Sequence, residues 1–307
     1  MISMHLKLLA SMIPLMQQLH AYAYNNKQLR YSHRKLPTEI QEFTTVTPRI
    51  INGSETNEEE YPYFVQLWIL NDLNKGEWYS CGGTLLHPKW ILTAAHCVID
   101  GVAIVALIGF YNLEIYSCTS EEPNADCFFL DPNLFYVHPE YDSFENDADF
   151  ALLNLGHHSR EAKSYPVINQ DYYIPVVNDT VTVVGRGITS ESSDGNLSYV
   201  PRETELVVVS HDKCESIYEK ILISLWYNAT ISTNMQCVTG YGTTGFCSGD
   251  SGGPILMKNY DDSGKDLLVG VVSMSVGCAS EDYPQVYSRV SAVASWIFSV
   301  APEISMN

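Results

Sequence analysis

From residue 50 onward, short apolar or alternating apolar and polar runs are separated by glycine, proline, asparagine and aspartate. Runs of this length between such turn residues are typical of β-strands. The expected strands cover residues 63–70, 84–86, 90–93, 102–108, 181–184, 205–209 and 267–272. Helical spacing of apolar residues occurs over residues 290–300, at Val293, Trp296, Ile297 and Val300. Many short strands with few helices predict an all-β protein, either a barrel or a sandwich.

The first 49 residues follow a different pattern. Lys7 precedes an apolar stretch over residues 8–16, and Ala21-Tyr22-Ala23 offers small residues for cleavage. This layout is that of a secretory signal peptide, since the apolar stretch is too short to cross a bilayer. Residues 24–49 are polar and basic and show no periodicity, so we predict a signal peptide over residues 1–23 and a propeptide over 24–49. No later segment has the roughly 20 apolar residues of a membrane span.

Composition narrows the class of protein. A chain of 307 residues with 46% hydrophobic and 17% charged residues can fold around a sizeable core. The formal net charge of -19 argues against a nucleic-acid partner, because a phosphate backbone requires a basic face. We interpret the charge as a solvated surface that keeps the protein soluble and can favour cationic partners.

Cysteine usage points to an oxidising compartment. Eight cysteines, an even number, fit a disulfide framework, and the alternative of a zinc site has no C-x-x-C pair to support it. Eight cysteines allow about 105 pairings, and the number of cysteines does not show which of these pairings forms. Four N-x-S/T sequons, at Asn52, Asn178, Asn196 and Asn228, are compatible with glycosylation during secretion. We therefore expect a secreted, extracellular glycoprotein.

Three short segments carry candidate chemistry. Residues 93–97 read TAAHC and contain His96, residues 149–153 read DFALL and begin with Asp149, and residues 249–254 read GDSGGP and contain Ser251. A single histidine is more often structural than catalytic, but the glycines around Ser251 give the backbone freedom that a serine on a tight turn needs. A serine hydroxyl becomes a nucleophile when an adjacent base takes its proton and a carboxylate holds that base in one tautomer.

In this order along the chain, the three segments resemble the trypsin/chymotrypsin family of serine proteases, whose triad is the worked example of this chemistry. Arg49 before the sequence IING resembles the family's activation junction, residues 61–65 its first core strand, and Val272-Ser273 its substrate-binding strand. The resemblance covers residues 50–299. It implies two packed antiparallel β-barrels with a C-terminal helix. The peptidase domain would cover residues 50–307, with barrels at about 50–160 and 161–290 and the helix at about 290–300.

The resemblance also implies the catalytic roles. Ser251 would be the nucleophile, His96 the general base and Asp149 the group that orients it, with Ser273 bonded to Asp149. The backbone N–H groups of Gly249 and Ser251 would stabilise the oxyanion. Such an enzyme is a secreted serine endopeptidase, a hydrolase whose substrates are proteins or peptides and whose further partners include protein inhibitors.

Activation follows from the same resemblance. A trypsin-like protease would cut after Arg49, and the new amino group of Ile50 would pair with Asp250. An unpaired buried carboxylate is costly, so this ion pair would hold the turn through Gly249 in its active form. The gene product is therefore expected to be a zymogen whose uncut pocket stays partly disordered.

The resemblance also has implications for the disulfides and for metal binding. The family pattern implies the pairs Cys81–Cys97, Cys214–Cys237 and Cys247–Cys278. The two remaining cysteines have no match in the common pattern but lie close in sequence, so we expect the pair Cys118–Cys127. Some relatives bind calcium in that loop, but Phe110 stands where the first ligand is expected, so we predict no metal and no cofactor.

Specificity depends on a few pocket positions. A trypsin-like pocket has an aspartate six residues before the nucleophile, where this chain has Gly245. At two wall positions where many relatives have glycine, this chain has Ser275 and Gln285, and Phe246 adds bulk nearby. These residues predict elastase-like or restricted chymotrypsin-like selectivity for uncharged side chains of small or medium size. The expected pocket residues are Gly245, Phe246, Ser273, Ser275 and Gln285.

Two other classes of function compete with this one. A catalytically silent homologue would act as a binding or regulatory module, but such proteins usually replace a triad member, and all three are present here. A structural or adhesive secreted protein would leave the triad unexplained. Covalent labelling of the processed protein by a fluorophosphonate distinguishes an active enzyme from both.

Overall fold

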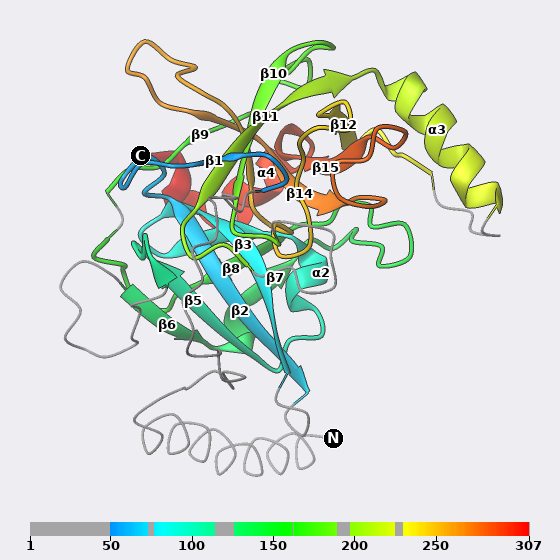
Figure 1. The fold of residues 1–307 in the computed structure, drawn as a ribbon. Coiled ribbons are helices and arrows are strands. Elements are labelled where there is room, and N and C mark those ends of the chain that lie inside the picture. Colours follow the sequence, from blue (N-terminus) through cyan, green and yellow to red (C-terminus); the bar gives the residue numbers. More distant parts are fainter. Residues whose placement is uncertain are drawn as a thin grey trace, which may run out of the picture. The chain divides into compact units, whose positions relative to one another are not determined.

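The computed structural model of the chain describes residues 50–72, 77–113, 126–161, 163–188, 197–224 and 230–306 (Figure 1). All of these belong to one compact unit, Thr47–Asn307. Strands dominate this unit and form two sheets. The fold is that of two β-barrels with a C-terminal helix, which confirms the predicted fold class.

The first sheet curls into a half-barrel of seven strands in the order β6-β5-β2-β3-β4-β8-β7, all paired antiparallel. Strand β4 lies between β3 and β8 within the sheet, and it is buried at every position because Trp90, Ile91 and Leu92 pack in the core cluster. The strands are β2 (Phe64–Asp72), β3 (Glu77–His87), β4 (Trp90–Thr93), β5 (Ala103–Ile108), β6 (Asp126–Leu130), β7 (Phe135–Val137) and β8 (Ala151–Asn154).

The second sheet closes on itself, because β11 pairs with both β10 and β12. The closed barrel has six strands. The short strand β9 lies beside it and pairs with β14 in parallel, whereas the other pairs of this sheet are antiparallel. Burial alternates along β11, where Thr204, Leu206 and Val208 point inward. The strands are β1 (Ser54–Glu55), β9 (Val167–Ile168), β10 (Thr180–Gly185), β11 (Arg202–Val209), β12 (Met235–Thr239), β13 (Pro254–Met257), β14 (Leu267–Met274) and β15 (Gln285–Arg289).

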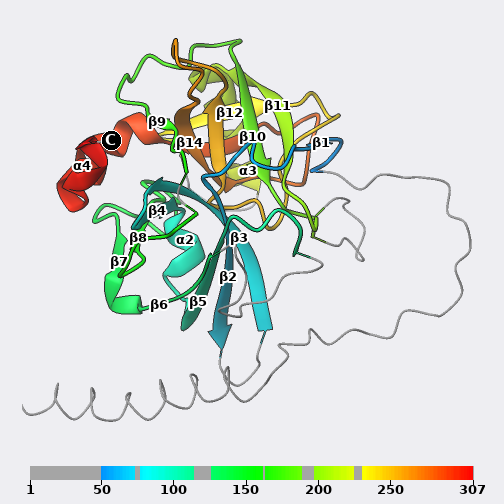
Figure 2. The ribbon, with the colours of Figure 1, turned by 90° about the vertical axis from the view of Figure 1, so that its left-hand side faces the viewer.

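The described helices are short and lie outside the barrels. The predicted C-terminal helix is α4 (Val290–Val300), and its buried face joins the core cluster that contains Trp90. Trp90 Nε1 also donates a hydrogen bond to Glu303 Oε1, 2.6 Å away. Figure 2 shows α4 beside β9 at one side of the molecule. The remaining helical elements are α2 (Ala95–Val98), α3 (His211–Ser224), η2 (Pro132–Leu134) and η3 (Pro302–Met306).

Two of the differences from the sequence-based expectation concern the second barrel. Helix α3 was not predicted, and it lies at the edge of the second barrel, tethered to β12 by the disulfide between Cys214 and Cys237 (Figure 1). Strand β1 falls in the range expected for the first barrel, yet Ser54 pairs with Glu203 in the second. The chain that follows Ile50 therefore runs first along the second barrel.

A close approach of backbone joins the two sheets at one place. The N–H of Gly82 in β3 donates to the carbonyl of Ser251 over 2.7 Å, and a Cβ added at Gly82 would lie 2.8 Å from the Cα of Gly253. A side chain at Gly82 would push the two apart. The junction between the barrels is thus where the GDSGGP segment docks. None of the helices that the structure describes is long and apolar enough to cross a membrane.

Candidate active site

His96 is held at the end of the first sheet. It lies in the single turn of α2, directly after β4, and the neighbouring Cys97 is bonded to Cys81 of β3 with an S–S distance of 2.00 Å. The imidazole is 29% exposed, whereas both cysteines are buried. This arrangement fixes the backbone around His96 and leaves one edge of the ring facing the solvent side.

Asp149 is completely buried and serves as the acceptor for three donors. His96 donates from its backbone N–H over 2.9 Å and from Nδ1 over 2.7 Å, and the Ser273 hydroxyl donates over 2.6 Å. Burial alone would lower the pKa of His96, but the hydrogen bond and the charge of Asp149 outweigh it and raise the pKa above its ordinary value. Because Nδ1 donates to Asp149, Nε2 is left as the proton acceptor of the neutral ring.

The turn that carries Ser251 lies next to this pair. Gly252 adopts φ +78°, and a Cβ there would lie 2.2 Å from Thr93 Oγ1 and 3.2 Å from the backbone nitrogen of Ala94. The nucleophile turn therefore packs against the segment that leads into His96. Among the described residues no hydrogen bond joins Ser251 Oγ to His96, whose Nε2 lies 3.7 Å from Cys97 Sγ. Catalytic hydrogen bonds are often long before substrate binds.

Two backbone N–H groups of the same turn find no partner within the part of the chain that the structure describes. The N–H groups of Asp250, Gly252 and Gly253 donate to the carbonyls of Cys247, Val272 and Asp250, respectively. Those of Gly249 and Ser251 donate to no group in the described chain. Gly249 has φ +97°, a conformation that favours glycine, and this conformation sets the direction of its N–H. The pair can receive a developing negative charge.

Asp250, the residue before Ser251, is also completely buried, but its carboxylate has different hydrogen-bond partners from that of Asp149. Its carboxylate accepts from the N–H of Gly187 over 2.6 Å and of Cys247 over 2.8 Å, and it has no ion pair among the described residues. Burial raises the pKa of Asp250 to about 6, although the two backbone hydrogen bonds act in the opposite direction. A Cβ at Gly185 would lie 2.0 Å from Asp250 Oδ1, so glycine there makes room for the carboxylate.

Ile50 lies in the second barrel although it is still joined to Arg49, which lies outside the described residues. The Ile50 side chain is fully buried, Ile51 forms a bridge with Gly245, and Asn52 Nδ2 donates to the carbonyl of Thr243. Residues 50–52 thus lie against the segment that continues to Cys247 and Asp250.

Gln285, an expected pocket residue, is buried beside Gly245. It is 2% exposed, its Oε1 accepts from the Phe246 N–H over 2.9 Å, and its Nε2 donates to the Phe246 carbonyl over 2.6 Å. A Cβ at Gly245 would lie 2.3 Å from that Oε1, so the amide fills the space beside Gly245. Ser275, another expected pocket residue, is exposed.

The Phe246 side chain lies in the core cluster of the second barrel, together with Val183 and Tyr287. Its contribution to substrate selectivity stays a prediction. Phe246 presents only its backbone to Gln285, while its large apolar side chain gains more by facing the barrel interior.

Disulfides stabilise the loops around the site. The structure contains the bonds Cys81–Cys97, Cys214–Cys237 and Cys247–Cys278. Cys127 is also in a disulfide, while Cys118 lies outside the described residues. Among the described side chains, Cys81, His96 and Cys97 form the one group at metal-ligand spacing. Its two sulfurs are already bonded to each other, so it does not fit a metal ion.

One buried residue near the site was missed from the sequence. Arg186 is 1% exposed and donates to the backbone carbonyls of Tyr199, Phe110 and Tyr111. The loop in which calcium was considered therefore turns two carbonyls toward a guanidinium. A weak signal for Arg186 was present in the sequence, since a cation stands between Gly185 and Gly187 directly after a buried strand.

Comparison with known proteins places these features in context. A family model described as trypsin matches residues 50–297. Chymotrypsin-like elastase family member 1 of Rattus norvegicus is 31% identical over 268 residues, which cover 85% of this chain and 92% of that protein. CLIP domain-containing serine protease B9 of Anopheles gambiae is 33% identical over 274 residues, which cover 82% of this chain and 63% of that protein.

Proposed function

Because the chain belongs to the trypsin/chymotrypsin family of serine proteases, we propose that it is an active endopeptidase with Ser251 as nucleophile, His96 as general base and Asp149 as the group that orients it. The observation that carries this proposal is the set of three hydrogen bonds to Asp149. They fix both the position of the imidazole and its tautomer, which is what a serine hydroxyl requires of its base.

The chemistry follows from these contacts. His96 Nε2 takes the proton from Ser251 Oγ as the oxygen attacks the peptide carbonyl carbon, and the carbonyl oxygen becomes an oxyanion between the N–H groups of Gly249 and Ser251. His96 then gives the proton to the leaving amine, and the C–N bond breaks to leave an acyl-enzyme. His96 next takes a proton from a water molecule, whose oxygen attacks the acyl carbon. The ester bond to Ser251 Oγ then breaks, the acid product leaves, and His96 returns the proton to Ser251 Oγ. Since the base must be neutral, activity should rise as pH passes the raised pKa of His96.

Cleavage after Arg49 completes the site in this proposal. Asp250 is a buried carboxylate with no cation beside it among the described residues, and Ile50 is buried nearby. A new ammonium at Ile50 would supply the missing charge and hold the turn that presents the Gly249 N–H. An activating trypsin-like protease is needed because Gly245 and Gln285 give this pocket no charge for Arg49.

Secretion is part of the same proposal. The N-terminal pattern and the disulfides support it. Of the two sequons that the structure describes, Asn178 is exposed at a turn before β10, while the Asn52 amide is engaged with Thr243. Asn178 is therefore the better candidate for a glycan.

Labelling by a fluorophosphonate tests the catalytic assignment. The chain cut after Arg49 should be labelled at Ser251, and Ser251→Ala should lose labelling and several orders of magnitude of peptide hydrolysis while keeping its fold. Ser248→Ala, at an exposed serine of the same turn, is the matched control and should still be labelled. A correctly cut wild-type chain that neither labels nor hydrolyses peptides would instead support a silent binding or regulatory homologue.

The pocket supports a preference for small or medium uncharged side chains before the cut. The Gln285 amide, fixed by two hydrogen bonds to Phe246, leaves little depth beside Gly245. Profiling on a mixed peptide library should show alanine, valine and leucine preferred to arginine and lysine. Gln285→Gly should shift the preference toward larger side chains by about tenfold, as expected for one or two methylenes in a pocket. Ser263→Gly, at an exposed serine of the turn after β13, is the control, and a basic preference in the wild type would overturn the assignment.

A further inference from the structure

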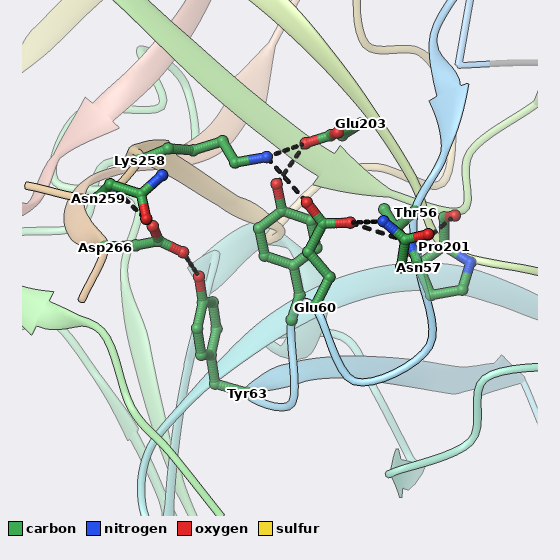
Figure 3. Close-up of polar contacts among 10 residues, drawn as sticks. Thr56, Asn57, Glu60, Tyr63, Pro201, Glu203, Lys258, Asn259 and Asp266 are labelled. Carbon is green, nitrogen blue, oxygen red and sulfur yellow. Dashed lines mark hydrogen bonds and ion pairs between the residues drawn. The ribbon is translucent and has the colours of Figure 1, made fainter. Parts of the chain in front are cut away.

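The chain just after the activation junction is attached along its length to the second barrel. We call residues 53–61 the strap. Strand β1 within it pairs with β11, and both the backbone N–H and the hydroxyl of Thr56 donate to the carbonyl of Pro201, over 3.1 and 3.2 Å (Figure 3). The strap therefore begins three residues beyond Ile50 and stays on one surface.

Arg202 holds the proximal end of the strap. It is 3% exposed, its Nη1 donates to the Gly53 carbonyl over 3.3 Å, and its Nη2 pairs with Glu55. Gly53 itself has no room for a side chain, since a Cβ there would lie 2.5 Å from the carbonyl oxygen of Glu203. The backbone at Gly53 is thus fixed by a buried cation and by a tight contact.

Lys258 holds the distal end. It directly follows β13, and its Nζ lies 2.9 Å from both Glu60 Oε1 of the strap and Glu203 Oε2 of β11 (Figure 3). The ammonium also lies 5.3 Å from the centre of the Tyr61 ring, and the Tyr61 hydroxyl donates to Glu203. Without Lys258, two carboxylates from different elements would face each other with no cation between them.

These charges persist over the range in which a protease works. Burial would lower the pKa of Lys258, but hydrogen bonds with Tyr61, Glu203 and Glu60 outweigh it and raise the pKa further above its ordinary value. Burial would raise the pKa of Glu60, but Asn57 and Lys258 outweigh it and lower the pKa. The attachment at Lys258 is therefore constant while an α-amino group, with a pKa near 8, titrates.

We propose that Arg202 and Lys258 are positioning residues that hold the strap on the second barrel, so that the amino group formed at Ile50 reaches Asp250. The proposal rests on the proposed activation by cleavage after Arg49. With the strap fixed, only residues 50–52 must become ordered when the amino group inserts. With the strap loose, a longer segment must be ordered, and the amino group has a lower effective concentration at the carboxylate.

The test measures insertion without relying on activity. The pKa of the Ile50 amino group in the cut protein is obtained from its rate of modification by acetic anhydride as a function of pH, followed by mass spectrometry. Pairing with Asp250 raises this pKa above that of a free amino terminus. Lys258→Met keeps an aliphatic stem over Tyr61 but removes the ammonium. We expect a tenfold weaker insertion, which lowers the apparent pKa by about one unit, and an alkaline limb of kcat/KM that moves by the same amount.

Two variants serve as controls. Lys258→Arg should restore the wild-type pKa, because its guanidinium can reach both glutamates. Lys163→Met removes a lysine that pairs with Glu59 of the strap and with Glu161, but whose side chain is 55% exposed, and it should leave the pKa unchanged. If Lys258→Met does not fold, the same comparison is made with Lys258→Gln.

The outcomes separate the two proposals. Equal amino-group pKa values in the cut wild type and in Lys258→Met would overturn the role of the strap, whatever the activity. A wild-type amino group with a raised pKa in a protein that hydrolyses nothing would contradict the proposed enzyme and leave the strap standing. A wild-type amino group that is modified like a free terminus would contradict insertion itself and the strap with it.

Discussion

Asp149 and Asp250 are both completely buried, yet the protein satisfies them in different ways. The Asp149 carboxylate accepts from three donors: the backbone N–H of His96, Nδ1 of the His96 ring and the hydroxyl of Ser273. Within the described chain Asp250 has two backbone N–H groups and no cation, and burial raises its pKa to about 6. The carboxylate beside His96 is thus compensated by three donors, whereas the carboxylate of Asp250 has no counter-charge among the residues described.

The difference has a physical cause. A buried carboxylate is costly unless hydrogen bonds and a nearby cation compensate its lost hydration. In the proposed reaction the imidazole beside Asp149 becomes a cation when it takes the serine proton, and the carboxylate stabilises that cation. For Asp250 the described part of the chain offers no such group, and under the proposed activation a new amino terminus would supply it. Because Asp250 precedes Ser251 directly, its compensation would then control the turn that carries Ser251.

The largest effect is expected when the hydrogen bonding between Asp149 and His96 is changed. Asp149→Asn should lower kcat by about 10⁴-fold, because an amide can hold His96 in the wrong tautomer; this magnitude is that of the same change in the family's worked example and is not specific to this chain. The measurement is steady-state hydrolysis by the cut protein, with Asp142→Asn, at an exposed aspartate of the same loop, as control. Near-normal kcat in Asp149→Asn would show that the imidazole is oriented by another group.

The next largest effect is expected when the cation proposed to pair with Asp250, the amino group of Ile50, is not formed. Arg49→Gln should prevent trypsin from making the Ile50 amino terminus and leave hydrolysis roughly 10²–10³-fold below that of the treated wild type, the usual cost of losing one oxyanion donor. Amino-terminal sequencing after treatment identifies the end that was formed. Arg34→Gln, within the same lead segment, should activate normally. Equal activity in Arg49→Gln without exposure of Ile50 would refute activation by insertion.

The smallest of the three effects tests the charge state of Asp250 in the uncut chain. A folded pKa of about 6 against 3.8 means that its contribution to stability is fully present below about pH 4 and is lost as pH rises through about 6. The asparagine in Asp250→Asn does not titrate. The free energy of unfolding of this variant, relative to that of the uncut wild type, should therefore rise by about 2 kcal/mol between pH 4 and pH 7.

Denaturant unfolding at the two pH values, with the disulfides kept oxidised, measures this gain. Asp262→Asn, at an exposed aspartate, should show a difference that does not depend on pH. In the cut protein the Ile50 ammonium compensates Asp250, so the gain should disappear there. The same gain in cut and uncut chains would mean that the amino group does not pair with Asp250.

Much of the architecture was predictable from local pattern. Strand β4 and helix α4 begin and end where the apolar runs do, because each buries a continuous or helically spaced apolar face. Strand β15 escaped prediction because its buried residues include Gln285, Ser288 and Arg289, whose burial depends on partners far away in the sequence. Helix α3 escaped because its polar sequence outweighed the signal of Cys214 and Tyr218, which are buried four residues apart.

The sequence by itself determined which residues are candidates for the chemistry, because the TAAHC, DFALL and GDSGGP segments are local patterns, and their resemblance to a known family already implied that Asp149 orients His96. Only the tertiary structure decided how the other buried groups are compensated. It gave Asp250 two backbone donors, turned the Phe246 ring into the core and bonded the Gln285 amide to the backbone of Phe246. Burial and hydrogen bonding between segments distant in sequence set these outcomes, and no local pattern encodes such contacts.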